Sequence, residues 1–114
     1  MEVTVQRGSE GSAPVVGVTG EVDVYSAPKL KESLKNLLQS GATTVVVDLS
    51  GVAFLDSTGL GALVEARAAT SEAGGALLLV CGQERILKLF TITGLDGVFA
   101  IYPNVAQAHE ALQA

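Results

Sequence analysis

Asp56, Ser57 and Thr58 form the one concentrated polar cluster within an apolar stretch of this 114-residue chain. They follow a hydrophobic segment and lie where a helix is predicted to begin. Side chains of these three types satisfy the free backbone N–H groups of a helix N-terminus, so capping alone would explain them. A serine there is also a good phosphate acceptor, because free N–H groups and the helix dipole accommodate an anion. On these residues alone both interpretations stay open.

Other motifs that support catalysis or cofactor binding are incomplete. No lysine follows a glycine anywhere, so there is no Walker A loop for a triphosphate. Gly59 and Gly61 begin a dinucleotide-binding pattern, but its third glycine position holds Val64. Asp48 and Asp56 resemble a carboxylate pair, yet nothing around them resembles a substrate pocket. We therefore predict that the protein is not an enzyme and uses no cofactor.

The single cysteine, Cys81, and the single histidine, His109, limit metal and thiol chemistry. They are too few for an ordinary zinc site, and one cysteine cannot form an intramolecular disulfide. We expect Cys81 to be a small buried hydrophobic residue. We expect His109 to be a solvated helix residue.

The charge balance excludes several classes of partner. Twelve acidic residues outnumber seven lysines and arginines, giving a net charge of −5, and aromatic residues are 4% of the chain. Nucleic acid and anionic membrane surfaces are disfavoured, because both attract basic proteins. The N-terminal residues show no signal-peptide pattern, and no apolar run approaches the roughly 20 residues of a membrane span. We expect a cytoplasmic protein.

Hydrophobic periodicity predicts nine elements in the order β-β-α-β-α-β-α-β-α. They are strands near 3–5 and 16–22, a helix over 26–38, a strand over 43–49, a helix from about 56 to the Gly74-Gly75 pair, a strand over 76–81, a helix over 83–93, a strand over 99–102 and a helix over 104–112. Alternating strands and helices indicate a mostly parallel sheet with right-handed crossovers. The first two strands predict an antiparallel hairpin. The chain is thus expected to be one α/β domain over residues 1–114, with about four helices and an N-terminal antiparallel strand.

Local signals predict how some helices begin and what they expose. Ser26 is placed to cap the first helix, with Pro28 in its first turn. Asn104, with Gln107 three residues later, resembles a capping box for the last helix. Lysines are concentrated on the first helix, which indicates a solvated face or a patch for a partner. These lysines are Lys29, Lys31 and Lys35.

Residues 47–61, VDLSGVAFLDSTGLG, resemble the signature of the STAS-domain family. Within that family they are most similar to the bacterial anti-sigma factor antagonists. GEVD at 20–23, APKL at 27–30, and TGLD at 93–96 with Phe99 also match the family pattern. The resemblance covers essentially the whole chain, including the Asp-Ser-Thr-Gly block.

This resemblance implies a phosphorylation switch. Antagonists of the family bind an anti-sigma factor that is also a serine kinase and so free a sigma factor. The kinase phosphorylates the serine of the Asp-Ser motif, here Ser57, the antagonist is released, and a serine phosphatase restores it. Asp56 and Thr58 flank the acceptor, and Asp23 matches a position near it.

Two questions remain open at this stage. Gly59 and Gly61 permit either close approach by a partner or tight packing on the sheet. The alternative functions are a STAS regulatory module of another signalling or transport complex, and a domain that binds a small ligand or nucleotide.

Overall fold

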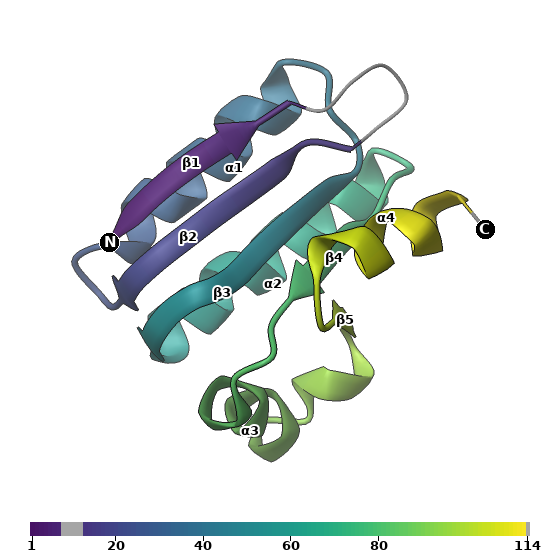
Figure 1. Ribbon diagram of the computed structural model, residues 1–114. Coiled ribbons are helices and arrows are strands. Elements are labelled where there is room, and N and C mark those ends of the chain that lie inside the picture. The colour runs from purple at the N-terminus through teal and green to yellow at the C-terminus, as the bar shows by residue number, and fades with distance from the viewer. Residues whose placement is uncertain (8–12, 114) are drawn as a thin grey trace.

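The structure is a computed structural model that describes residues 1–7 and 13–113 (Figure 1). The predicted element order is confirmed, with one short 3-10 helix, η1, added before the last strand. The elements are β1 (Glu2–Gln6), β2 (Val15–Val22), α1 (Ala27–Gln39), β3 (Val45–Leu55), α2 (Ser57–Glu72), β4 (Leu77–Val80), α3 (Glu84–Ile92), η1 (Leu95–Gly97), β5 (Ala100–Tyr102) and α4 (Val105–Gln113).

The five strands form one sheet in the order β1-β2-β3-β4-β5. β1 runs antiparallel to β2, and the other neighbouring pairs are parallel, as the sequence predicts. The turn expected between β1 and β2 lies mostly outside the described residues. Helices α1 and α2 cover one face of the sheet, and α4 lies on the opposite face near β4 (Figure 1). Parallel neighbours place the carboxyl ends of β2 and β3 at the same edge.

The main core lies between the sheet and the helices α1, α2 and α3. Leu30, Leu34 and Leu37 of α1 are buried there, as their helical spacing predicts, whereas Leu38 is only partly buried. Phe90 and Phe99 meet edge to face, with ring centroids 5.7 Å apart. A second, smaller cluster joins α4 to the other face of β3 and β4. None of the helices among the described residues is long and apolar enough to cross a membrane.

β3 is longer than the predicted strand over 43–49, because it continues through Leu55. The pairing of β3 with β2 shifts register twice. Gly51 lies beside Thr19 of β2, and a Cβ on Gly51 would lie only 2.6 Å from the Thr19 Cγ2, so glycine fits this close approach. The Gln83 side chain spans this irregular segment and donates to the carbonyl oxygens of Leu49, Ser50 and Val52 at 2.9, 3.0 and 2.8 Å. The extension carries the chain to the sheet edge, where α2 begins.

Two other expectations need correction. The Ser26 side chain does not cap α1, because its hydroxyl bonds within the preceding loop. His109 is half-buried rather than fully solvated, and its Nε2 lies 3.3 Å from the carbonyl oxygen of Ala13. By contrast, the buried state of Cys81 is confirmed, and this burial raises the pKa of its thiol. The first half of the capping box is also confirmed, since the N–H of Gln107 donates to Asn104 Oδ1 at 2.8 Å.

Candidate functional site

Two loops meet at the carboxyl edge of the sheet, one after β2 and one after β3. Residues 23–26 connect β2 to α1, and Asp56 alone connects β3 to α2. The Asp56 N–H donates to the carbonyl oxygen of Val22 at 3.2 Å, so the two chain segments are joined directly. The polar cluster predicted from sequence therefore lies beside the loop that contains Asp23.

Asp56 is the N-cap of α2. Its backbone is extended, with φ −107° and ψ −172°, and its Oδ1 accepts the N–H groups of Thr58 and Gly59 at 3.0 and 3.2 Å. The Thr58 hydroxyl donates to the same oxygen. The Thr58 hydroxyl, followed by the two backbone N–H groups, lowers the pKa of Asp56, although partial desolvation opposes the shift. The carboxylate is thus held ionised at the helix terminus, where a negative charge is favourable.

Ser57 is the first residue of α2 and is exposed. Its hydroxyl makes no hydrogen bond to any described residue, whereas the Thr58 and Ser50 hydroxyls donate to Asp56 and Asp48. Of these three hydroxyls, only that of Ser57 is both exposed and free of an acceptor. Of the three, Ser57 is therefore the hydroxyl best placed to react with another protein.

The expectation that free N–H groups would receive a phosphate is wrong for most of this terminus. Asp56 already takes the N–H groups of Thr58 and Gly59 through its side chain, and that of Leu60 through its carbonyl oxygen. A phosphate on Ser57 would consequently remain at the surface, next to an ionised carboxylate.

Asp23 organises the loop after β2. Its Oδ1 accepts the N–H groups of Tyr25 and Ser26, both at 3.0 Å, and the Ser26 hydroxyl lies 3.1 Å away. The Ser26 N–H is the main cause of a lowered pKa for Asp23, and the Asp56 carboxylate acts in the opposite direction. The Asp56 carboxylate therefore lies close enough to Asp23 to raise its pKa slightly against the hydrogen bonds. Asp48 is used separately, accepting the Ser50 N–H at 2.9 Å.

Gly59 and Gly61 have different surroundings. Gly59 is buried, and a Cβ on it would lie 2.4 Å from Leu55 Cδ1 and 2.9 Å from Val22 Cγ1. Gly61 is exposed, and a Cβ on it would meet nothing within 4 Å. Gly59 therefore permits tight packing of α2 on the sheet, whereas Gly61 leaves open space beside the helix.

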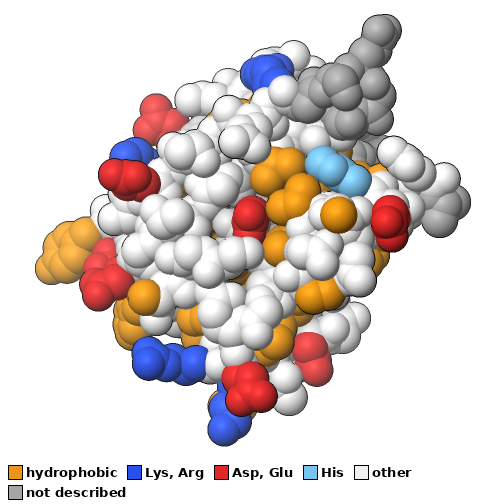
Figure 2. All heavy atoms as spheres, in the orientation of Figure 1, with side chains coloured by type: hydrophobic (Ala, Val, Ile, Leu, Met, Phe, Trp, Pro, Cys, Tyr) orange, Lys and Arg blue, Asp and Glu red, His pale blue; other side chains and the backbone are white. Residues whose placement is uncertain are grey.

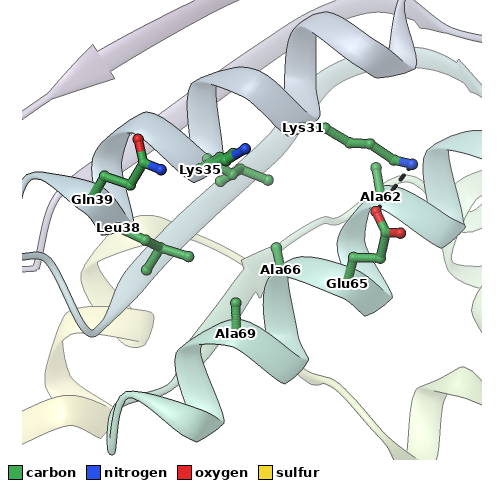
Figure 3. Close-up of a pocket in the computed structure, with 9 residues that line it drawn as sticks. Lys31, Lys35, Leu38, Gln39, Ala62, Glu65, Ala66 and Ala69 are labelled. Atoms are coloured by element: carbon green, nitrogen blue, oxygen red, sulfur yellow. Dashed lines mark ion pairs between the residues drawn. The ribbon is translucent and has the colours of Figure 1, made fainter.

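A shallow hollow of about 330 Å³ borders the site between α1 and α2. It is lined by Val24, Ala27, Pro28, Lys31, Thr58, Gly61 and Glu65. Lys31 of α1 and Glu65 of α2 form an ion pair with an N–O distance of 3.0 Å. Figure 3 shows this pair at one end of an apolar groove of about 460 Å³ between the two helices. Both side chains of the pair are well exposed, at 48% and 66%, so the pair contributes little stability. Lys29 and Lys35 are exposed as well.

Sequence reasoning missed the apolar residues around this edge. Val24, Tyr25 and Phe54 are exposed by 57%, 91% and 47% of their surfaces. The available signal was Val24 and Tyr25 lying between Asp23 and Ser26, in a turn where polar residues are usual.

Within the described part of the chain, no group of His, Cys, Asp and Glu side chains is arranged to hold a metal ion.

The chain is similar to known proteins, and the matching family model covers both loops of this site. The family model of the STAS domain matches residues 4–108. An anti-sigma-B factor antagonist of Bacillus subtilis (strain 168) is 43% identical over 86 residues, which are 75% of this chain and 78% of that protein. An anti-sigma-B factor antagonist of Staphylococcus aureus (strain NCTC 8325 / PS 47) is 36% identical over 101 residues, 89% of this chain and 94% of that protein. The crystal structure of an anti-sigma factor antagonist from Mycobacterium paratuberculosis has a TM-score of 0.82 at 30% identity, covering 99% of this chain and 96% of that one.

Proposed function

The chain belongs to the STAS-domain family, and we propose that it acts there as an anti-sigma factor antagonist. It binds an anti-sigma factor that is also a serine kinase, and this binding releases a sigma factor. The observation that carries the proposal is the exposed hydroxyl of Ser57, which bonds to no described residue and lies beside the Asp56 cap. Two relatives named anti-sigma-B factor antagonists, 43% and 36% identical to this chain, support it.

Phosphorylation of Ser57 switches the antagonist off. The Ser57 oxygen bonds to the γ-phosphorus of ATP, the bond to the β-phosphate oxygen breaks, and ADP leaves. The hydroxyl proton passes to a base of the kinase or to solvent. A serine phosphatase hydrolyses the phosphoserine and restores the binding form.

Release follows from charge rather than from a change of fold. A phosphate adds about −1.5 to −2 charges at pH 7. Asp56 already occupies the N–H groups of Thr58 and Gly59, and Asp23 adds a second carboxylate nearby. A partner surface suited to a neutral serine would then meet a bulky dianion. Misplaced charge in an interface costs several kcal/mol, and every 1.4 kcal/mol is about tenfold in affinity.

Each site residue has a distinct part in this proposal. Asp56 and Thr58 fix the start of α2, so that Ser57 is presented at the surface. Asp23 holds the neighbouring loop. Gly59 lets α2 lie directly on β2 and β3, and Gly61 leaves room for a partner to approach the helix.

The proposal is tested by capture from a lysate of the source bacterium with the wild-type chain and with Ser57→Ala, read by mass spectrometry. The captured kinase is then purified and incubated with the antagonist, ATP and Mg²⁺, and the phosphorylated residue is mapped. We expect phosphate on Ser57, none on Ser57→Ala, and normal transfer to the matched control Ser50→Ala. Phosphate mainly on Thr58 or Ser50, or the absence of any captured kinase, would contradict it.

A further inference from the structure

Three large apolar side chains are exposed on the two chain segments that lead into the Ser57 site. Tyr25 is 91% exposed, so its ring contributes almost nothing to the core. Val24 lines the same hollow as Thr58. Phe54 precedes Leu55, which points into the core, and alternation along the strand directs Phe54 to the opposite face. Exposed apolar residues gathered around one polar site indicate an interaction surface.

Hydrogen bonds fix the backbone of the loop that carries Val24 and Tyr25. Asp23 Oδ1 accepts the N–H of Tyr25, and the Ser26 hydroxyl lies 3.0 Å from the Glu21 carbonyl oxygen, to which it can donate. The N–H groups of Ser26 and Ala27 also donate to the Asp23 carbonyl oxygen at 3.2 and 2.8 Å. The loop backbone is therefore ordered before any partner arrives. Binding to a preorganised loop loses less conformational entropy, which favours affinity.

Acidic side chains border the apolar ones. Glu21 pairs with Phe54 across β2 and β3, and Asp23 and Asp56 lie in the two loops. Figure 2 shows hydrophobic side chains protruding at the left margin, near the β2–α1 loop of Figure 1, with acidic side chains beside them. A partner surface complementary to this one would have an apolar pocket with basic side chains around it.

We propose that Tyr25 is the apolar anchor by which this chain binds its anti-sigma factor, and that Val24 and Phe54 add apolar surface at the same edge of the sheet. The inference rests on the proposed function and adds the chemistry of the contact. The Tyr25 ring enters an apolar pocket of the anti-sigma factor, and basic side chains around that pocket face Glu21, Asp23 and Asp56. Buried tyrosines near the centre of an interface commonly carry much of the binding energy.

The charge distribution argues against a second copy of this chain as the occupant. Two copies meeting at this surface would bring Glu21, Asp23 and Asp56 of one copy against the equally acidic surface of the other. The chain as a whole carries a net charge of −5, which adds to the repulsion. A basic, apolar surface on a different protein avoids this cost.

The test compares four proteins by titration calorimetry against the purified anti-sigma factor of the source bacterium: wild type, Tyr25→Ala, Tyr25→Phe and Ile92→Ala. Ile92 is the matched control, because it is 74% exposed but lies at the end of α3, outside the site. We expect Tyr25→Ala to weaken binding by at least about tenfold, and Tyr25→Phe and Ile92→Ala to stay within about twofold of wild type. Thermal melts should coincide for wild type and Tyr25→Ala, since the ring is outside the core.

The possible failures are distinguishable. If the wild type binds and Tyr25→Ala binds equally well, the anchor is wrong while the proposed function stands. If the wild type does not bind the anti-sigma factor, the proposed function fails and the anchor fails with it. If sedimentation shows a wild-type dimer that Tyr25→Ala abolishes, the surface serves a second copy and the inference is overturned.

Discussion

The backbone N–H of Thr58 donates to the Asp56 carboxylate at 3.0 Å, and this bond makes Asp56, not Ser57, the cap of α2. The residue that holds the helix and the residue proposed to be modified are therefore adjacent but different. This separation allows stability and switching to be changed independently by single substitutions.

Removing the Asp56 side chain should destabilise the protein. Asp56→Ala leaves the N–H groups of Thr58 and Gly59 without their acceptor, and loss of an N-cap costs about 0.5–2 kcal/mol. Asp56→Asn is the control, since asparagine also caps helices and removes only the charge. The free energies of unfolding in urea should rank wild type and Asp56→Asn above Asp56→Ala. Equal values for the two variants would show that the charge, not the cap, matters.

Ser57→Ala should leave stability nearly unchanged, within about 0.5 kcal/mol, because its exposed hydroxyl supports no hydrogen bond among the described residues. Thr58→Ala should cost about 1 kcal/mol, because it removes the hydroxyl that donates to Asp56. Thermal and urea unfolding measured side by side compare the two. A larger loss for Ser57→Ala than for Thr58→Ala would place the structural role on Ser57.

Acid should weaken the fold through Asp23 and Asp56. Hydrogen bonds lower both pKa values below 3.8, so each ionised carboxylate stabilises the folded state. This contribution is present above the unfolded pKa of about 3.9 and is lost as the pH falls through the lower folded values. The variant with both Asp23→Asn and Asp56→Asn should therefore show a flatter fall in unfolding free energy between pH 5 and 3. Carboxyl titration by NMR provides the direct check, and midpoints above 3.8 would contradict the expectation.

The two glycines of α2 should respond oppositely to alanine. Gly59→Ala forces a methyl group against Leu55 and Val22, and overpacking of this kind costs about 1–3 kcal/mol. Gly61→Ala meets open space in a helix and should stabilise the protein by about 0.5–1 kcal/mol. Unfolding in urea measures both. Equal effects would mean that α2 does not lie against β2 and β3 as described.

The element order follows from hydrophobic periodicity, but two details of the helix N-termini depend on tertiary competition. Asp56, Ser57 and Thr58 can all cap a helix, and the bond from the Asp56 N–H to Val22 decides which one does. Ser26 resembles a cap, yet the Asp23 carboxylate and the Glu21 carbonyl oxygen bind its polar groups.

The extension of β3 and the exposure of Tyr25 are not among the features predicted from the sequence. Gly51 interrupts the apolar pattern of β3, and the strand continues because it pairs with β2 and receives the hydrogen bonds of Gln83. Whether an apolar residue of a loop packs inward or stays exposed depends on the hydrogen bonds that fix the loop, here those of Asp23.

The central claim is tested most directly by titration calorimetry of the purified anti-sigma factor kinase against unmodified and Ser57-phosphorylated antagonist. The account predicts binding at least about a hundredfold weaker for the phosphorylated form, from several kcal/mol of misplaced charge. Ser57→Ala should bind like the unmodified protein, and Ser57→Asp should lie between them, because its single charge is smaller than that of a phosphate. Equal affinity of the phosphorylated and unmodified forms would contradict the switch.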